Sequence, residues 1–277
     1  IIEEFAFYQC LDLANISFPS NSQLKLIEKY AFSYSKIQKL SFPPSILLID
    51  ESCFCDMSNL NEVSVNNQFI SANSEFIFCK SNKENSTFDT LLHARKNIVN
   101  AVIPSNIKYI SSNAFRECKK LKKVSFEDKS QLISIGESGF NGCIELNSIN
   151  LPFYVEYIGP NAFNGCPKLK LQISQANLNE PFVYYDFSSK NFAIPPFFES
   201  IKKSAFYDFL SITSLSIPPS VQVIEDHTFE KCSSLTTVTF QAGSQCKSIG
   251  AYAFNECSKL EKIEIPPSVQ VIEDYTF

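Results

Sequence analysis

The sequence lacks several features that would point to a common class of protein. It has no tryptophan, one methionine and two histidines in 277 residues. No apolar run reaches the roughly 18 residues that a membrane-spanning helix needs, so we expect no part of this chain to insert into a membrane. We expect no signal peptide in the first residues of this chain, and any targeting signal would lie outside it. The net charge of −5 argues against a general role in binding nucleic acid.

The sequence also lacks the motifs of common catalytic and cofactor sites. There is no Ser-His-Asp order, H-E-x-x-H, G-x-S-x-G, P-loop or dinucleotide fingerprint. His93 lies in an irregular stretch, and His227 takes a position that tyrosine or asparagine holds elsewhere, so we expect it to face solvent. The acidic pairs Glu225–Asp226 and Glu273–Asp274 recur with a repeat, which favours solvated edges over a catalytic pair. We therefore predict neither enzymatic activity nor a cofactor.

Phenylalanine is present in excess, with 26 residues, and it marks a repeat. IPPSVQVIEDHTF at 217–229 returns as IPPSVQVIEDYTF at 265–277. The whole pattern reads A-F-x-x-C-x-x-L-x-x-V-x-F/I, often followed by proline and then by V-x-x-I. Successive anchor phenylalanines stand 22 to 25 residues apart, except across two wider gaps. The anchors are Phe7, Phe32, Phe54, Phe115, Phe140, Phe163, Phe206, Phe229, Phe254 and Phe277.

This spacing predicts a β-rich repeat solenoid. In a strand such as Leu260–Ile265, alternate side chains point inward, and stacked turns bury the shared core that one turn cannot. We expect V-x-x-I, as in Val221–Ile224, to form a second short strand. The A-F segment should form a tight helical turn with phenylalanine pointing inward, leaving little regular α-helix. We expect one domain over 1–277 with roughly 11 to 12 turns, and irregular units at about 66–102 and 172–193.

Six cysteines share one position of the repeat: Cys10, Cys118, Cys143, Cys166, Cys232 and Cys257. A free cysteine behaves as a small buried hydrophobe, so we expect a ladder of inward-facing thiols. Stacked disulfides or a metal are the alternatives. Cys53 and Cys55 flank Phe54, but a metal there would need ligands from elsewhere. Cys79 and Cys246 are expected to be the most exposed thiols.

Each predicted strand has one residue between its last two inward positions, and alternation directs that residue outward. The row comprises Ser17, Ser41, Ser64, Ser125, Asn150, Ser216, Thr239 and Glu264. Because repeat solenoids use extended surfaces for binding, the row is a candidate partner-binding surface. Alternatively, these small polar side chains only keep the sheet soluble. The basic run at 116–123 could contact a phosphate or a sulfated glycan, although a solvated turn is the simpler interpretation.

Two N-x-S/T sequons are present. Asn85 lies in a polar stretch and is a candidate glycosylation site if the protein is secreted. Asn15 begins a predicted strand, where a sugar would occupy the strand face and prevent a partner from packing there.

These units resemble BspA-like leucine-rich repeats, a family found in surface proteins of bacteria and parasitic protists. The family pattern is close to I-P-x-x-V-x-x-I-G-x-x-A-F-x-x-C-x-x-L-x-x-V. Residues 103–124, IPSNIKYISSNAFRECKKLKKV, follow it, as do 151–169 and 217–265. The glycine of I-G occurs only at Gly136, Gly159 and Gly250. The resemblance implies a leucine-rich repeat fold over nearly the whole chain.

The resemblance also implies a function that the residues alone do not specify. It implies a non-enzymatic, protein-binding, adhesin-type or antigenic protein at the cell surface or secreted, with a host or extracellular-matrix protein as partner. The residues themselves support only an extended binding scaffold. A cytoplasmic scaffold therefore stays open, since reducing compartments keep thiols free. The chain begins at IIEEFAF inside the pattern and ends within a repeat, so we interpret it as part of a longer protein.

Overall fold

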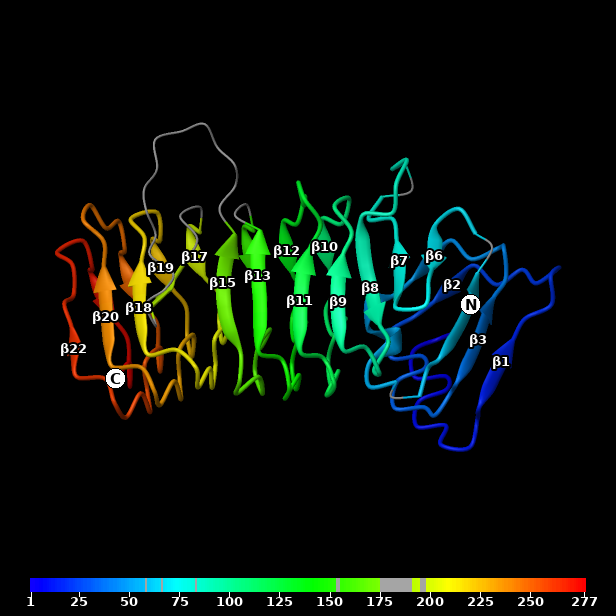
Figure 1. The fold of residues 1–277 in the computed structure, drawn as a ribbon, viewed down its shortest axis with the longest axis horizontal. Coiled ribbons are helices and arrows are strands. Elements are labelled where there is room, and N and C mark those ends of the chain that lie inside the picture. Colours follow the sequence, from blue (N-terminus) through cyan, green and yellow to red (C-terminus); the bar gives the residue numbers. More distant parts are fainter. Residues whose placement is uncertain (58, 66, 83, 153–154, 175–190, 195–197) are drawn as a thin grey trace.

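The computed structural model describes residues 1–57, 59–65, 67–82, 84–152, 155–174, 191–194 and 198–277. These residues form a β-solenoid of about 10 turns, which confirms the leucine-rich repeat solenoid expected from the sequence. Figure 1 shows the turns stacked along the longest axis of the molecule. The second irregular unit, at 172–193, lies mostly outside the described residues, so the predicted count of 11 to 12 turns stays a prediction.

One side of the solenoid carries the strands of the L-x-x-V-x-F/I segment, and we call it the long-strand face. The strands pair in parallel, in the orders β1-β3-β5, β9-β11-β13-β15 and β16-β18-β20-β22. Their bounds are β1 (Asn15–Ser17), β3 (Lys39–Phe42), β5 (Glu62–Val65), β9 (Asn100–Ile103), β11 (Lys123–Phe126), β13 (Ser148–Pro152), β15 (Lys170–Ser174), β16 (Asn191–Ala193), β18 (Ser214–Ile217), β20 (Thr237–Phe240) and β22 (Lys262–Ile263).

The other side carries the predicted V-x-x-I strands, and we call it the short-strand face. Its parallel orders are β2-β4, β8-β10-β12-β14 and β17-β19-β21-β23. The bounds are β2 (Leu26–Ile27), β4 (Leu48–Ile49), β8 (Thr90–Ala94), β10 (Tyr109–Ile110), β12 (Ser134–Ile135), β14 (Tyr157–Ile158), β17 (Ser200–Ile201), β19 (Val223–Ile224), β21 (Ser248–Ile249) and β23 (Val271–Ile272).

The A-F segment forms a tight turn whose amides bond along the solenoid. Among the described residues, the one helix is the 3₁₀ helix η1 (Glu51–Phe54). Elsewhere the residues two before and two after phenylalanine have positive φ, as His227 (55°) and Lys231 (63°) do around Phe229. The N–H groups of 227, 229 and 231 therefore donate to the carbonyls of residues 251, 253 and 255 in the next turn, at 2.8–2.9 Å. This third ladder replaces helical hydrogen bonds and satisfies the buried amides.

Phenylalanine rings fill the axis of the solenoid. Phe140 stacks on Phe115 with ring centroids 4.7 Å apart and on Phe163 at 5.6 Å. Eight of the ten anchors are at most 1% exposed: Phe32, Phe54, Phe115, Phe140, Phe163, Phe206, Phe229 and Phe254. The other two differ from the predicted core, since Phe7 is half-buried and Phe277 is 53% exposed. Each still stacks on its neighbour in the ladder, Phe7 on Phe32 and Phe277 on Phe254.

The repeat thiols lie beside this stack. Cys118, Cys143, Cys166, Cys232 and Cys257 are buried, whereas Cys10 is half-buried. The Cys143 Sγ donates to the carbonyl of Phe115 at 3.1 Å, and the Cys232 Sγ donates to that of Phe206 at 3.3 Å. Burial raises the pKa of the Cys143 and Cys232 thiols well above the usual value, which keeps them protonated as donors. All ten cysteines are free.

The expectation that Cys246 is exposed is wrong, because its side chain is fully buried. Cys246 stands three residues before Ile249, as Val221 stands three before Ile224, so it fills the valine position of V-x-x-I. Cys79 is half-buried, and burial raises its pKa to about 12. The sequence around Cys246 is typical of a loop, so the residue was predicted to be exposed although it belongs to the core.

An antiparallel hairpin interrupts the regular turns between β5 and β9. β6 (Ile70–Ala72) pairs with β7 (Phe76–Cys79), and β7 pairs with β8, which continues into the parallel short-strand sheet. Alternate side chains of β7 and β8 face two different cores. Phe76, Phe78 and Leu91 pack with the residues that follow, while Ile77 and Leu92 pack with those that precede. A strand buried on both faces explains the continuous apolar runs FIFC and TLLHA.

Candidate partner-binding face

The structure places the eight row residues on the long-strand face, all of them exposed or half-buried. Ser17, Ser41 and Ser64 are direct register partners across β1, β3 and β5. Ser216 and Thr239 are partners across β18 and β20. The row is not continuous, because the hairpin separates β5 from β9 into different sheets.

Three positions of the same register were not predicted. Val102 pairs with Ser125, Gln172 with Asn150, and Ala193 with Ser216. Val102 is 52% exposed, so an apolar side chain stands at the outward position of β9. Val102 was not predicted because it is apolar, although its position directly before the inward-facing Ile103 marks it as an outward residue.

Some row hydroxyls also stabilise the sheet. The Ser125 Oγ donates to the carbonyl of Ala101 at 3.3 Å, and the Thr239 Oγ1 donates to that of Leu215 at 3.2 Å. A hydroxyl has one proton, so these two groups can offer a partner only their acceptor lone pairs. Ser216 accepts a hydrogen bond from Gln241 at 3.0 Å. The row therefore has a structural role beside any binding role.

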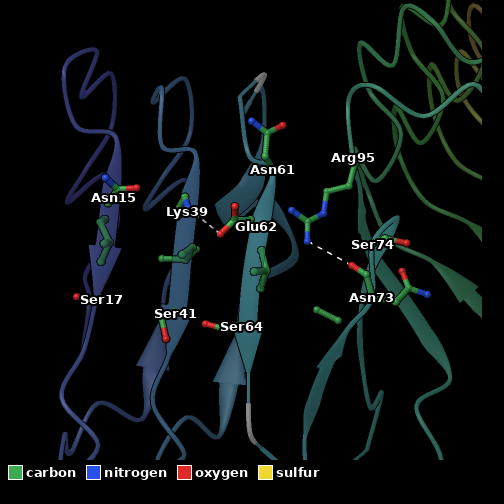
Figure 2. A pocket seen from close by; sticks show the side chains of 14 residues that line it. Asn15, Ser17, Lys39, Ser41, Asn61, Glu62, Ser64, Asn73, Ser74 and Arg95 are labelled. Atoms are coloured by element: carbon green, nitrogen blue, oxygen red, sulfur yellow. Dashed lines mark hydrogen bonds and ion pairs between the residues drawn. The ribbon is translucent and has the colours of Figure 1, made fainter.

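A groove of about 590 Å³ lies over β1, β3 and β5 on this face. Ser17, Ser41 and Ser64 lie along its strands, as Figure 2 shows. The opposite side comes from the loop between β6 and β7, with Asn73 and Ser74, and from residue 95 directly after β8. The hairpin thus converts an open sheet face into a groove with one wall.

The charges of the groove are unequally matched. Lys39 and Glu62 form an exposed ion pair at 3.0 Å. The Arg95 side chain instead donates from Nη1 to the carbonyl of Leu60 and from Nη2 to that of Asn73, both at 3.4 Å. Arg95 is 3% exposed, and its Nε has no hydrogen-bond partner among the described residues. Burial lowers the pKa of Arg95, and Glu62 opposes that change, but an arginine stays charged.

Arg95 was not predicted as a site residue, and neither were Asn61, Asn73 and Ser74. The backbone N–H of Arg95 donates to the carbonyl of Glu75 at 2.8 Å, so the hairpin holds it in place. Contacts of this kind do not recur from one repeat to the next, so the repeat pattern does not predict them. The one indication in the sequence is that a single arginine directly follows the apolar run TLLHA.

Asn85, the candidate glycosylation site, is half-buried. Its Nδ2 donates to the Asp89 carboxylate at 2.8 Å and to the Ser81 hydroxyl at 3.1 Å. A glycan on this nitrogen would have to break or rearrange those bonds, so glycosylation here stays a prediction. Asn15 is exposed on β1 and lines the groove.

The other charged candidates form ion pairs. In the basic run, the Arg116 Nε pairs with the Asp56 carboxylate at 3.2 Å, and Lys119 pairs with Glu117 of its own turn at 3.0 Å. The acidic pair at 225–226 faces two lysines of the preceding turn, Lys202 and Lys203.

The two histidines lie in different surroundings. His227 is half-buried, bonds to Glu230 and stacks on Tyr252 with ring centroids 4.9 Å apart. His93 is buried against Phe54, and burial lowers its pKa well below the usual value, so it is neutral. In the described part of the chain, no group of three or more His, Cys, Asp and Glu side chains could hold a metal. Within the same residues, no helix is long and apolar enough to cross a membrane.

Comparison with known proteins agrees with this architecture. The family described as BspA type Leucine rich repeat region matches residues 1–94, 89–182 and 180–277. No curated protein matches the sequence. Among solved structures, a leucine-rich repeat protein from Eubacterium ventriosum has a TM-score of 0.71 at 22% identity, over 98% of this chain and 66% of its own. A leucine-rich repeat protein from T. pallidum has a TM-score of 0.50 at 22% identity, over 69% and 90%. The present chain thus spans just under two thirds of the Eubacterium protein.

Proposed function

The chain belongs to the BspA-type leucine-rich repeat family, and on that premise we propose that it is a non-enzymatic protein-binding domain. The long-strand face is the proposed binding surface. The observation that carries this proposal is the alignment of Ser17, Ser41 and Ser64 across three neighbouring strands beside a groove of about 590 Å³. Small side chains in register let a partner approach the sheet closely. The hairpin forms one wall of the groove and would limit how a bound partner is oriented.

We further propose that the domain works at the cell surface or in secreted form, as an adhesin-type or antigenic protein. The resemblance to a family of surface proteins in bacteria and protists supports this location. The partner would be a protein, of the host or its extracellular matrix. Nucleic acid is disfavoured, because the whole chain has a net charge of −5.

The binding face can be tested with a matched pair of substitutions. The wild-type chain is titrated against immobilised extracellular-matrix proteins, and the titration is repeated with Ser41→Arg and Ser248→Arg. Ser41 lies on β3 of the long-strand face, whereas Ser248 lies on β21 of the short-strand face, and both are half-buried. We expect saturable binding that Ser41→Arg weakens at least tenfold, or about 1.4 kcal/mol, and that Ser248→Arg leaves unchanged.

Equal loss with both substitutions, with both variants folded, would count against the long-strand face. The surface location is tested separately, by labelling intact cells that express the full-length gene with an antibody against residues 1–277. Labelling only after permeabilisation would contradict it.

One observation favours a second candidate, a cytoplasmic scaffold built from the same repeats. All ten cysteines are free, as a reducing compartment would keep them. The same labelling of intact cells separates the two proposals. Modification of Asn85 by a glycan would also count against a cytoplasmic location.

A further inference from the structure

We infer that the groove over β1, β3 and β5 holds an extended acidic peptide, one carboxylate of which binds the Arg95 guanidinium. The inference rests on the proposed function, since it names the chemistry of the partner segment at the same face. It goes further by assigning a recognition residue outside the repeat.

The first argument is the incomplete set of contacts around a buried cation. Arg95 is 3% exposed, yet no carboxylate pairs with it among the described residues. Its two hydrogen bonds are both 3.4 Å long, beyond the usual 2.7–3.2 Å for N–H···O. They use two of five N–H groups, and the Nε proton has no partner. A buried cation is stabilised most by a carboxylate that accepts two parallel hydrogen bonds, which a guanidinium is shaped to donate.

The second argument is the charge of the groove lining. Glu62 forms its ion pair with Lys39 at 3.0 Å, so among the described charges of the groove Arg95 is the one without an ion-pair partner. One carboxylate matches this single positive charge. Glu62 repels every anion, and it repels a phosphate dianion more strongly than a singly charged carboxylate.

The third argument is the polar lining beside Arg95. Figure 2 shows Asn15 and Asn61 on the strand side of the groove and Asn73 on the side of Arg95. A side-chain amide has both donors and an acceptor, as a peptide group does. The Asn73 Oδ1 already accepts from the backbone N–H groups of Glu75 and Phe76 at 2.8 and 2.7 Å, so Asn73 offers a peptide its Nδ2 donors. The serines at 17, 41 and 64 are small enough for a peptide backbone to lie close to the sheet. A segment with one Asp or Glu therefore fits the groove better than an isolated anion does.

The experiment uses peptides as probes and the complete 277-residue chain. Two pools of fluorescein-labelled heptapeptides are made, with every position randomised except the centre, which is Glu in one pool and Gln in the other. Affinity is measured by fluorescence anisotropy at fixed salt concentration. We expect the Glu pool to bind at least tenfold more tightly than the Gln pool. Because this exchange is made in the ligand, the folding of the protein cannot account for the difference.

Protein variants then locate the effect. Arg95→Gln should remove the preference for Glu over Gln, whereas Lys168→Gln, at an exposed ion pair outside the groove, should keep it. Thermal unfolding of each variant shows whether Arg95→Gln acts on folding, and if it does not fold the comparison of the two pools decides alone. Ser41→Trp, which fills the groove without adding a charge, should abolish binding of both pools.

Three results would overturn the inference. Equal binding of the Glu and Gln pools, with loss of both in Ser41→Trp, would refute the carboxylate contact and leave the proposed binding face standing. A folded Arg95→Gln that keeps the preference for Glu would refute the role of Arg95. Binding of neither pool would refute a peptide groove. The titration with matrix proteins would then still test whether the long-strand face binds a partner.

Discussion

Replacing Phe140 by alanine should destabilise the solenoid strongly, because this ring lies in the middle of the phenylalanine ladder. The ring is fully buried and stacks on Phe115 and Phe163, at 4.7 and 5.6 Å. Truncating a buried phenylalanine costs about 3–5 kcal/mol, through lost transfer energy and the cavity that remains. The two ring stacks, each worth roughly 0.5–1.5 kcal/mol beyond area burial, place Phe140→Ala in the upper part of this range, at about 4–5 kcal/mol.

Phe277→Ala is the matched control, at the same position of the repeat. Its ring is 53% exposed and stacks on Phe254 at 5.8 Å. Because only about half of this ring is buried, Phe277→Ala should lower the free energy of unfolding by about 1 kcal/mol. Urea unfolding followed by far-UV circular dichroism measures both variants. Hydrogen exchange at β11 and β13 then shows whether the loss is local, since solenoids can unfold in segments. A cost below about 1.5 kcal/mol for Phe140→Ala, or equal costs for both, would refute the argument.

Two further predictions concern glycine and the thiols. Gly136→Ala should cost more than about 2 kcal/mol, since its Cβ would lie 2.4 Å from the backbone nitrogen of Ser112. Gly243→Ala should cost only about 1 kcal/mol, since φ is +79° but nothing lies within 4 Å, and equal costs in urea unfolding would contradict this. Burial raises the pKa of Cys143, so the unfolded chain releases this proton first as pH rises. Its contribution to stability should therefore be complete below about pH 8.5 and decline above it. Urea unfolding at pH 7 and pH 10 should show that stability falls less with pH in Cys143→Ala than in the wild type. Identical declines in the two proteins would count against a buried thiol.

The periodic features of the fold could be predicted from the sequence. Positions that recur every 22 to 25 residues contact their own copies in neighbouring turns. For this reason Leu40 pairs with Val63 and Val238 with Ile263, and the outward row follows from strand alternation. Close approach of neighbouring turns explains the three glycines of I-G. At Gly136, Gly159 and Gly250 a Cβ would come within 2.4–2.6 Å of the backbone of the preceding turn.

The remaining features depend on contacts without a period. The positive φ values around the anchors occur at Phe, Tyr, Asn, Asp, Gln, Ser, His, Lys and Glu residues as well as at Gly142 and Gly165. Inter-turn hydrogen bonds hold these residues there against their local preference, so composition gives no sign of it.

The groove residue Arg95 is a similar case. It lies far in sequence from Leu60, whose carbonyl it reaches only because the hairpin folds back between two cores.

The measurement that tests the central claim most directly is hydrogen exchange of the whole chain with and without a matrix protein that it binds. We predict that protection on binding concentrates in β1, β3 and β5 and in the segment around Asn73 and Arg95, while β19 and β21 of the short-strand face stay unchanged. Protection confined to the short-strand face, or saturable binding without protection at β1, β3 and β5, would contradict the account.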